Sequence, residues 1–184
     1  MGMRVIAAAV ALIAVSGTAY ADEEASNTTH VAASEYGRCY AKSVPAESYG
    51  GKGTTYVLQV NDSQDTLLHT YDWFSQEIQL ACNVSDGLTP TGISLVRFGP
   101  WARGRVASRE QLAVGFYFKG KKLKEYSTLD IAGEPENVST SVSHYTVFEK
   151  VLGYRWLGGN KAVFEVKTSD GRMLSFDPAT AERQ

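Results

Sequence analysis

Apolar residues recur at every second position along most of this 184-residue chain, and this period restricts the fold more than any other feature. An extended strand places successive side chains on opposite faces of a sheet. The clearest example is the segment 112–118: one face would carry Leu112, Val114, Phe116 and Phe118, and the other Ala113, Gly115 and Tyr117. Because neither face carries a charge, this segment is predicted to be a central strand.

Two other segments show the same alternation. Residues Tyr56, Leu58 and Val60 alternate with Val57 and Gln59. In the segment 77–82, Ile78, Leu80 and Cys82 alternate with Glu77, Gln79 and Ala81. The second pattern predicts that the Cys82 side chain points into the protein.

Short polar turns separate these alternating segments, at 61–65, 119–121, 158–160 and 169–171. Connections this short join antiparallel strands. We find no stretch with the period of three or more helical turns, and one short helical turn is expected at 108–111, capped by Ser108. The sequence predicts an all-β fold: an antiparallel sandwich or barrel of about eight to ten strands built from sequential hairpins.

A faint repeat leaves an alternative architecture open. Three hairpins each contain a leucine followed by an aromatic residue and an aspartate, and these leucines (Leu68, Leu123 and Leu174) lie roughly fifty residues apart. This spacing is typical of propeller blades. Three units are too few to close a ring, so the alternative is an incomplete, propeller-like array of hairpins.

Residues 1–21 have the pattern of a cleaved signal peptide. Arg4 precedes the apolar run 5–15, and Ala19-Tyr20-Ala21 forms a small-x-small cleavage site. The apolar run is shorter than the roughly 20 residues that span a bilayer, and no transmembrane segment is expected after the signal is removed. We therefore predict a periplasmic or secreted protein with a flexible leader at 22–36 and a single β domain at 37–184.

Cys39 and Cys82 are the only two cysteines, and an oxidising compartment favours their pairing in a disulfide. Neither belongs to a C-x-x-C motif. The three histidines (His30, His69 and His144) stand far apart without the spacing of metal ligands. The sequence therefore implies no metal site, and without a glycine-rich phosphate loop it implies no cofactor.

The charge balance does not indicate a nucleic-acid partner. The chain has 18 basic and 20 acidic residues, a formal net charge of −2, whereas nucleic-acid binders usually carry a clustered basic excess. Glycosylation sequons occur at Asn27, Asn61, Asn83 and Asn137, and their use depends on the host. The oligomeric state is left open.

The segment 97–105 holds the candidate ligand-binding residues Arg97, Trp101, Arg103 and Arg105. A guanidinium group offers a planar fork for carboxylate, sulfate or phosphate, and an indole ring offers a flat face for a sugar. These residues predict an exported, non-catalytic β module that binds an anionic glycan-like ligand or an envelope protein. In the competing structural interpretation, Trp101 covers one end of the barrel and the arginines pair with nearby acids.

Two other functions are weaker alternatives. Asp72, Glu77 and Asp130 lie among aromatic residues and would suit a small polysaccharide hydrolase of the envelope, and a structural or assembly component is the other alternative. A serine hydrolase is disfavoured, because there is no G-x-S-x-G motif and Ser143 and His144 would point to opposite faces of a strand. No motif is specific enough to indicate a family.

Overall fold

The computed structural model describes residues 27–47, 51–88 and 91–184. The predicted signal peptide at 1–21 lies outside these residues. The described part of the chain forms fourteen strands and one short helix, arranged in four antiparallel sheets. The all-β class and the sequential hairpins are therefore confirmed. The one helix in these ranges is not long and apolar enough to cross a bilayer.

The first sheet contains strands β1 to β4 in sequence order: β1 (His30–Ala33), β2 (Cys39–Val44), β3 (Thr54–Gln59) and β4 (Thr66–Tyr71). Strand β1 pairs with β2 from His30 opposite Ser43 to Ala33 opposite Tyr40. The prediction of a flexible leader is therefore wrong at residues 30–33, which form a paired strand. The segment lacks an apolar alternation, and it is held through backbone pairing that a composition-based argument does not detect.

The second sheet has the order β5-β6-β8-β9: β5 (Ile78–Val84), β6 (Gly92–Phe98), β8 (Leu112–Phe118) and β9 (Lys121–Ser127). Strand β8 lies between β6 and β9, and six of its seven residues are buried. Its prediction as a central strand is confirmed. On β3, by contrast, the buried side chains are Thr55 and Val57, on the face opposite Tyr56 and Leu58.

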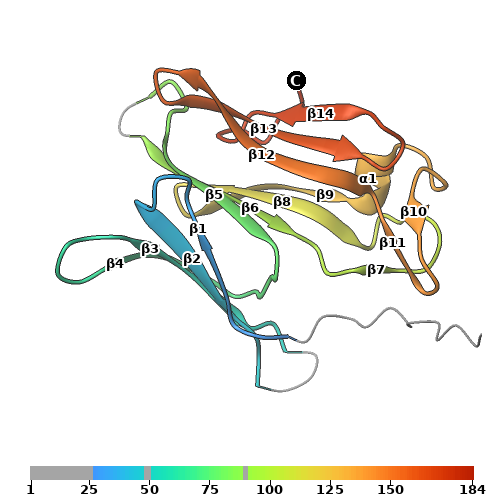
Figure 1. The fold of residues 1–184 in the computed structure, drawn as a ribbon, viewed down its shortest axis with the longest axis horizontal. Coiled ribbons are helices and arrows are strands. Elements are labelled where there is room, and N and C mark those ends of the chain that lie inside the picture. The colour runs from blue at the N-terminus through green and yellow to red at the C-terminus, as the bar shows by residue number, and fades with distance from the viewer. Residues whose placement is uncertain (1–26, 48–50, 89–90) are drawn as a thin grey trace, which may run out of the picture.

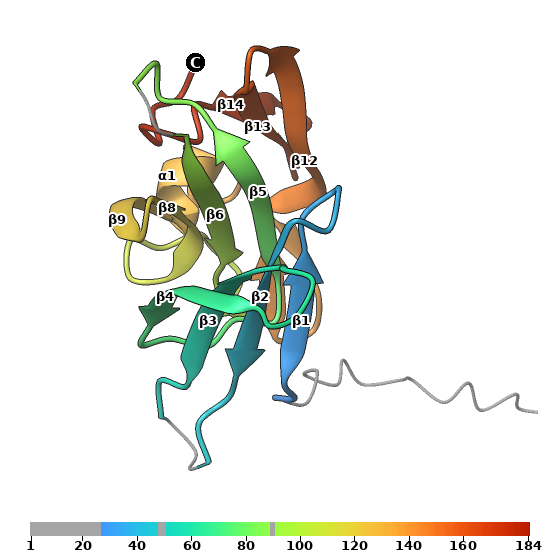
Figure 2. The ribbon, with the colours of Figure 1, turned by 90° about the vertical axis from the view of Figure 1, so that its left-hand side faces the viewer.

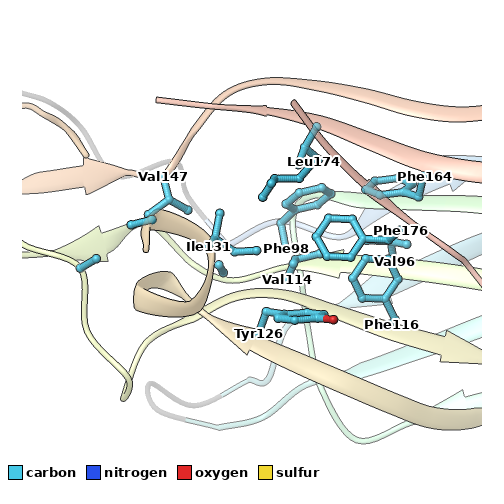
Figure 3. Packing of buried hydrophobic residues seen from close by; sticks show 14 of the residues in the cluster. Val96, Phe98, Val114, Phe116, Tyr126, Ile131, Val147, Phe164, Leu174 and Phe176 are labelled. Atoms are coloured by element: carbon cyan, nitrogen blue, oxygen red, sulfur yellow. The ribbon is translucent and has the colours of Figure 1, made fainter. Parts of the chain in front are cut away.

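The third sheet has the order β12-β13-β14 and packs on one face of the second sheet (Figure 1): β12 (Phe148–Gly158), β13 (Lys161–Thr168) and β14 (Met173–Phe176). The largest core fills the space between these two sheets. Figure 3 shows Phe116 of the second sheet beside Phe176 of the third, and both are fully buried together with Phe164. Burial of such aromatic side chains supplies much of the stabilisation of a β sandwich.

The first sheet covers the other face of the second sheet, so the protein has three layers (Figures 1 and 2). A second core cluster joins Cys39, Ala41 and Val57 of the first sheet to Leu95 and Tyr117 of the second. The predicted disulfide is present between Cys39 on β2 and Cys82 on β5, with the two Cα atoms 6.3 Å apart. It links the outer first sheet covalently to the middle sheet.

A fourth, short sheet lies at one end of the sandwich, in the order β10-β11-β7: β7 (Ala102–Arg103), β10 (Ser139–Thr140) and β11 (His144–Thr146) (Figure 1). Short strands of two to four residues raise the strand number above the predicted eight to ten. The sheets keep free edges and do not close into a barrel. The hairpins of Leu68, Leu123 and Leu174 lie in three stacked sheets, which differs from the radial arrangement of propeller blades.

The short helix lies at a different place from the one predicted. Helix α1 (Thr128–Ala132) begins with a capping box in which Ser127 and Asp130 satisfy each other's backbone N–H groups. At 108–111 there is no helix; the Ser108 hydroxyl instead accepts a hydrogen bond from the Glu110 N–H at 3.1 Å. The predicted turns at 61–65, 119–121, 158–160 and 169–171 all connect antiparallel strands.

Candidate functional site

A pocket of about 280 Å³ lies where the short sheet meets the end of the sandwich. Its lining comes from β11, from the segment before β7, from the end of β6 and from the start of β8. Its apolar wall includes Phe98, Leu112, Val147 and Phe148. Polar groups come from Glu77, His144 and the hydroxyls of residues 139–141. An apolar cavity with a few polar groups is the usual form of a small ligand site.

Trp101 lies at the edge of this pocket and remains 54% exposed. Gly99 and Pro100 end β6, and the next residue after Trp101, Ala102, pairs with Tyr145 on β11. This pairing places the indole against the imidazole of His144, with the ring centroids 5.7 Å apart in an edge-on arrangement. Much of the indole surface is therefore available to a ligand.

His144 lines the pocket as a buried polar residue, with 8% of its surface exposed. Its Nδ1 atom lies 2.8 Å from the Ser143 hydroxyl. The prediction that Ser143 and His144 point to opposite faces of a strand is therefore wrong, because Ser143 precedes β11 and is not bound by its alternation. Nε2 of His144 has no hydrogen-bond partner among the described residues, so no carboxylate completes a catalytic triad there.

Arg97 does not belong to the pocket. Its side chain lies on the opposite face of β6 from Phe98 and contacts the cluster between the first and second sheets. The guanidinium donates to Glu125 at 2.7 Å and lies over the Trp73 ring, 4.7 Å from the centroid. With only 17% of its side chain exposed, Arg97 connects two layers through an ion pair and a cation–π contact.

Arg103 and Arg105 are exposed and do not line the pocket. Arg103 is opposite His144 in the β7–β11 pair. The next residue, Gly104, donates its N–H to the Ser143 carbonyl at 3.1 Å, which holds this segment against β11. Of the four candidates, Trp101 lines the pocket, Arg103 pairs with His144, which also lines it, and Arg97 lies elsewhere.

The three candidate acids are also separated. Asp72 is exposed and pairs with Lys52 at 3.4 Å. Asp130 caps α1, and hydrogen bonds from Ser127 lower the pKa of its carboxyl. Glu77 is the single acidic residue that lines the pocket, at its rim. Its side chain remains accessible to solvent, but the surrounding wall removes part of its hydration and raises its pKa.

The sequence pattern did not indicate that His144 and the hydroxyls at 139–141 line one pocket. The run Ser139, Ser141 and Ser143 was visible, but its pairing with the segment after Trp101 joins residues about forty positions apart. Among the described residues, no group of three histidine, cysteine or acidic side chains is arranged to hold a metal ion. No family model, curated protein or solved structure matches the chain.

Proposed function

We propose that this protein is an exported, non-catalytic β module that binds an anionic glycan-like ligand at the pocket beside Trp101. The observation that carries the proposal is the half-exposed indole of Trp101 at the edge of an apolar pocket. An exposed tryptophan in this setting offers a flat face on which a sugar ring can stack. The sandwich and the short sheet hold the pocket on paired strands, which favours a preformed site.

The groups around the indole determine the class of ligand. Arg103 and Arg105 are exposed on the segment that follows Trp101, and their guanidinium groups suit a carboxylate or sulfate substituent. The hydroxyls at 139–141 line the pocket and can exchange hydrogen bonds with sugar hydroxyls. A protonated Glu77 at the rim would add a further donor.

Export is supported by the signal-like residues 1–21 and by the Cys39–Cys82 disulfide. Disulfides persist in oxidising compartments such as the periplasm and the extracellular space. The compartment is therefore one in which envelope or extracellular glycans are present.

The arrangement of acids favours binding over hydrolysis. Most glycoside hydrolases need two carboxyl groups on either side of the scissile bond. Among the residues that line the pocket only Glu77 is acidic, while Asp72 pairs with Lys52 and Asp130 caps α1. The hydrolase alternative lacks its second carboxylate at this pocket.

Calorimetry with a panel of uronic-acid and neutral oligosaccharides tests the proposal. We expect an acidic oligosaccharide to bind without being cleaved, and Trp101→Ala to weaken binding at least about tenfold, since a central aromatic anchor contributes strongly to affinity. Trp156→Ala is the matched control, because Trp156 lies on β12 away from this pocket. The proposal is wrong if no acidic glycan binds, or if the two tryptophan variants behave alike.

A further inference from the structure

A second, larger groove lies on the flank of the protein where the edges of two sheets meet. Strand β5 is the edge of the second sheet and β12 is the edge of the third. Figure 2 shows the two strands on the same flank, with the turn between β1 and β2 close to them. The groove between these three segments has a volume of about 580 Å³. It shares no lining residue with the Trp101 pocket.

The backbone of β5 offers hydrogen-bonding groups to this groove. Phe98 N–H donates to the Glu77 carbonyl at 3.0 Å, and Ile78 is opposite Arg97 in the β5–β6 pair. In an antiparallel ladder, alternate residues direct their N–H and C=O groups to the partner strand. The groups of Gln79 therefore point to β6, and those of Leu80 point to the free edge. Leu80 lines the groove although only 5% of the residue is exposed, because its side chain packs in the cluster between the first and second sheets.

A register shift between Ala81 and Val84 interrupts β5, and the regular part of its free edge, Ile78–Ala81, lacks the charged residues and the proline that protect an edge strand. The whole of β5, IQLACNV, contains no charged residue and no proline. Strand β9, at the other edge of the same sheet, has the sequence KKLKEYS with three lysines. Lysines on an edge strand discourage pairing with a further strand, whereas an uncharged edge invites it.

The side chains around the groove fit an uncharged peptide. Trp156, Tyr36 and Leu152 provide apolar surface, and Leu152 is 44% exposed at a register shift in β12. The charged residues that line the groove are Glu35 and Arg38, one of each sign. The Glu35 carboxylate accepts a hydrogen bond from the Trp156 indole at 3.2 Å, and this exposed contact joins the β1–β2 turn to β12.

We propose that the groove between β5 and β12 binds an uncharged, extended peptide segment of a partner protein, which adds a strand to the free edge of β5. In this mode of recognition, main-chain hydrogen bonds supply affinity and alternate side chains enter pockets beside the added strand. The added strand would lie between the third sheet and the β1–β2 turn.

The test uses a random twelve-residue peptide library displayed on phage, selected on the immobilised protein and followed by synthesis of the tightest binder. We expect N-methylation of alternate peptide residues to weaken binding at least tenfold, and N-methylation of the intervening residues to change it little. Amide exchange at Leu80 should slow when the peptide is bound, because its N–H becomes hydrogen-bonded.

Two variants locate the site and separate this proposal from the glycan proposal. Trp156→Ala should weaken peptide binding at least tenfold and leave glycan binding unchanged, and Trp101→Ala should do the reverse. The proposal is overturned if selection yields no binder sensitive to Trp156→Ala. It is also overturned if N-methylation shows no alternation, or if the exchange protection lies on β9 instead of β5.

Discussion

At the scale of single residues, the four candidates of the segment 97–105 lie in different parts of the structure. Successive residues of a strand point to opposite faces, so Arg97 on β6 turns to the layer interface while Phe98 enters the main core. Trp101, Arg103 and Arg105 follow the end of β6; Trp101 lines the pocket, and Arg103 pairs with His144, which also lines it. The shared local sequence suggested one site, but the strand separates the first arginine from the others.

Substitution of Arg97 is expected to lower stability without a direct effect on ligand binding. Arg97→Met removes the ion pair with Glu125 and the contact with Trp73, and the expected loss in the free energy of unfolding is roughly 1 to 3 kcal/mol. Urea denaturation measures it. Arg105→Met is the control: its stability should stay within about 0.5 kcal/mol of the parent protein, while its affinity for an acidic glycan falls. Equal stability of the two variants would contradict this assignment.

Glu77 should make binding of an anionic ligand depend on pH. The raised pKa means that its carboxyl stays protonated and neutral to a higher pH than an ordinary glutamic acid. As the pH rises through this raised pKa, the carboxylate becomes negative and repels the ligand, so affinity should fall. Calorimetric titrations at pH values from about 4 to about 8 measure this change in affinity, because carboxyl groups and histidine titrate over that range.

Glu77→Gln should flatten the part of this profile that belongs to Glu77. The same group predicts a change in stability, because it binds its proton more tightly in the folded than in the unfolded protein. The free energy of unfolding should therefore decrease as the pH rises from the ordinary to the raised pKa. If affinity instead increased with pH in the parent protein, Glu77 would not act on the ligand.

At the scale of secondary-structure elements, regular alternation and polar turns predicted the long strands and their hairpins, as β8 and its turn to β9 show. Strands β1, β7, β10 and β11 escaped prediction because two to four residues are too few to establish a period. The position of the helix was also missed. Its signal, Ser127 followed by Asp130, is a capping pattern, but the apolar alternation before it favoured a continuing strand.

A pair of serine substitutions tests which residue caps the helix. Ser127→Ala removes the acceptor for the Asp130 N–H and should lower the free energy of unfolding by about 1 kcal/mol, the typical cost of losing an N-cap. Ser108→Ala, at the position that the sequence favoured, should cost less than half of that, because Ser108 contacts only the Glu110 N–H through its hydroxyl. Thermal or urea denaturation of both variants measures the two losses in stability. A larger loss for Ser108→Ala than for Ser127→Ala would contradict Ser127 as the N-cap.

At the scale of the whole molecule, the sequence predicted the all-β class and the disulfide but not the stacking of three layers. The uncharged faces of β8 indicated burial on both sides, yet they did not reveal which segments cover each face. The Trp101 pocket was similarly predicted only in part. Its tryptophan was a candidate from the sequence, whereas His144 and Glu77 reach the pocket through pairings between distant parts of the chain.

The disulfide should stabilise the attachment of the first sheet to the second. In the chain-entropy model, a cross-link that closes a loop of this size, with a sequence separation of 43, contributes about 4 kcal/mol. Urea denaturation of the Cys39→Ser/Cys82→Ser double variant, beside the parent protein, should show a loss of about this size. Amide exchange should accelerate most in β1 to β4; a uniform acceleration through β13 and β14 would contradict a layer-specific role.

The middle layer comes from the middle of the polypeptide, and its two covers come from either side of it along the chain. The surface around Phe116 is covered only when β13 and β14 pack on it through Phe164 and Phe176. A truncated chain that ends before Phe164 would expose the apolar aromatic face of the middle sheet, and we expect such a chain to aggregate.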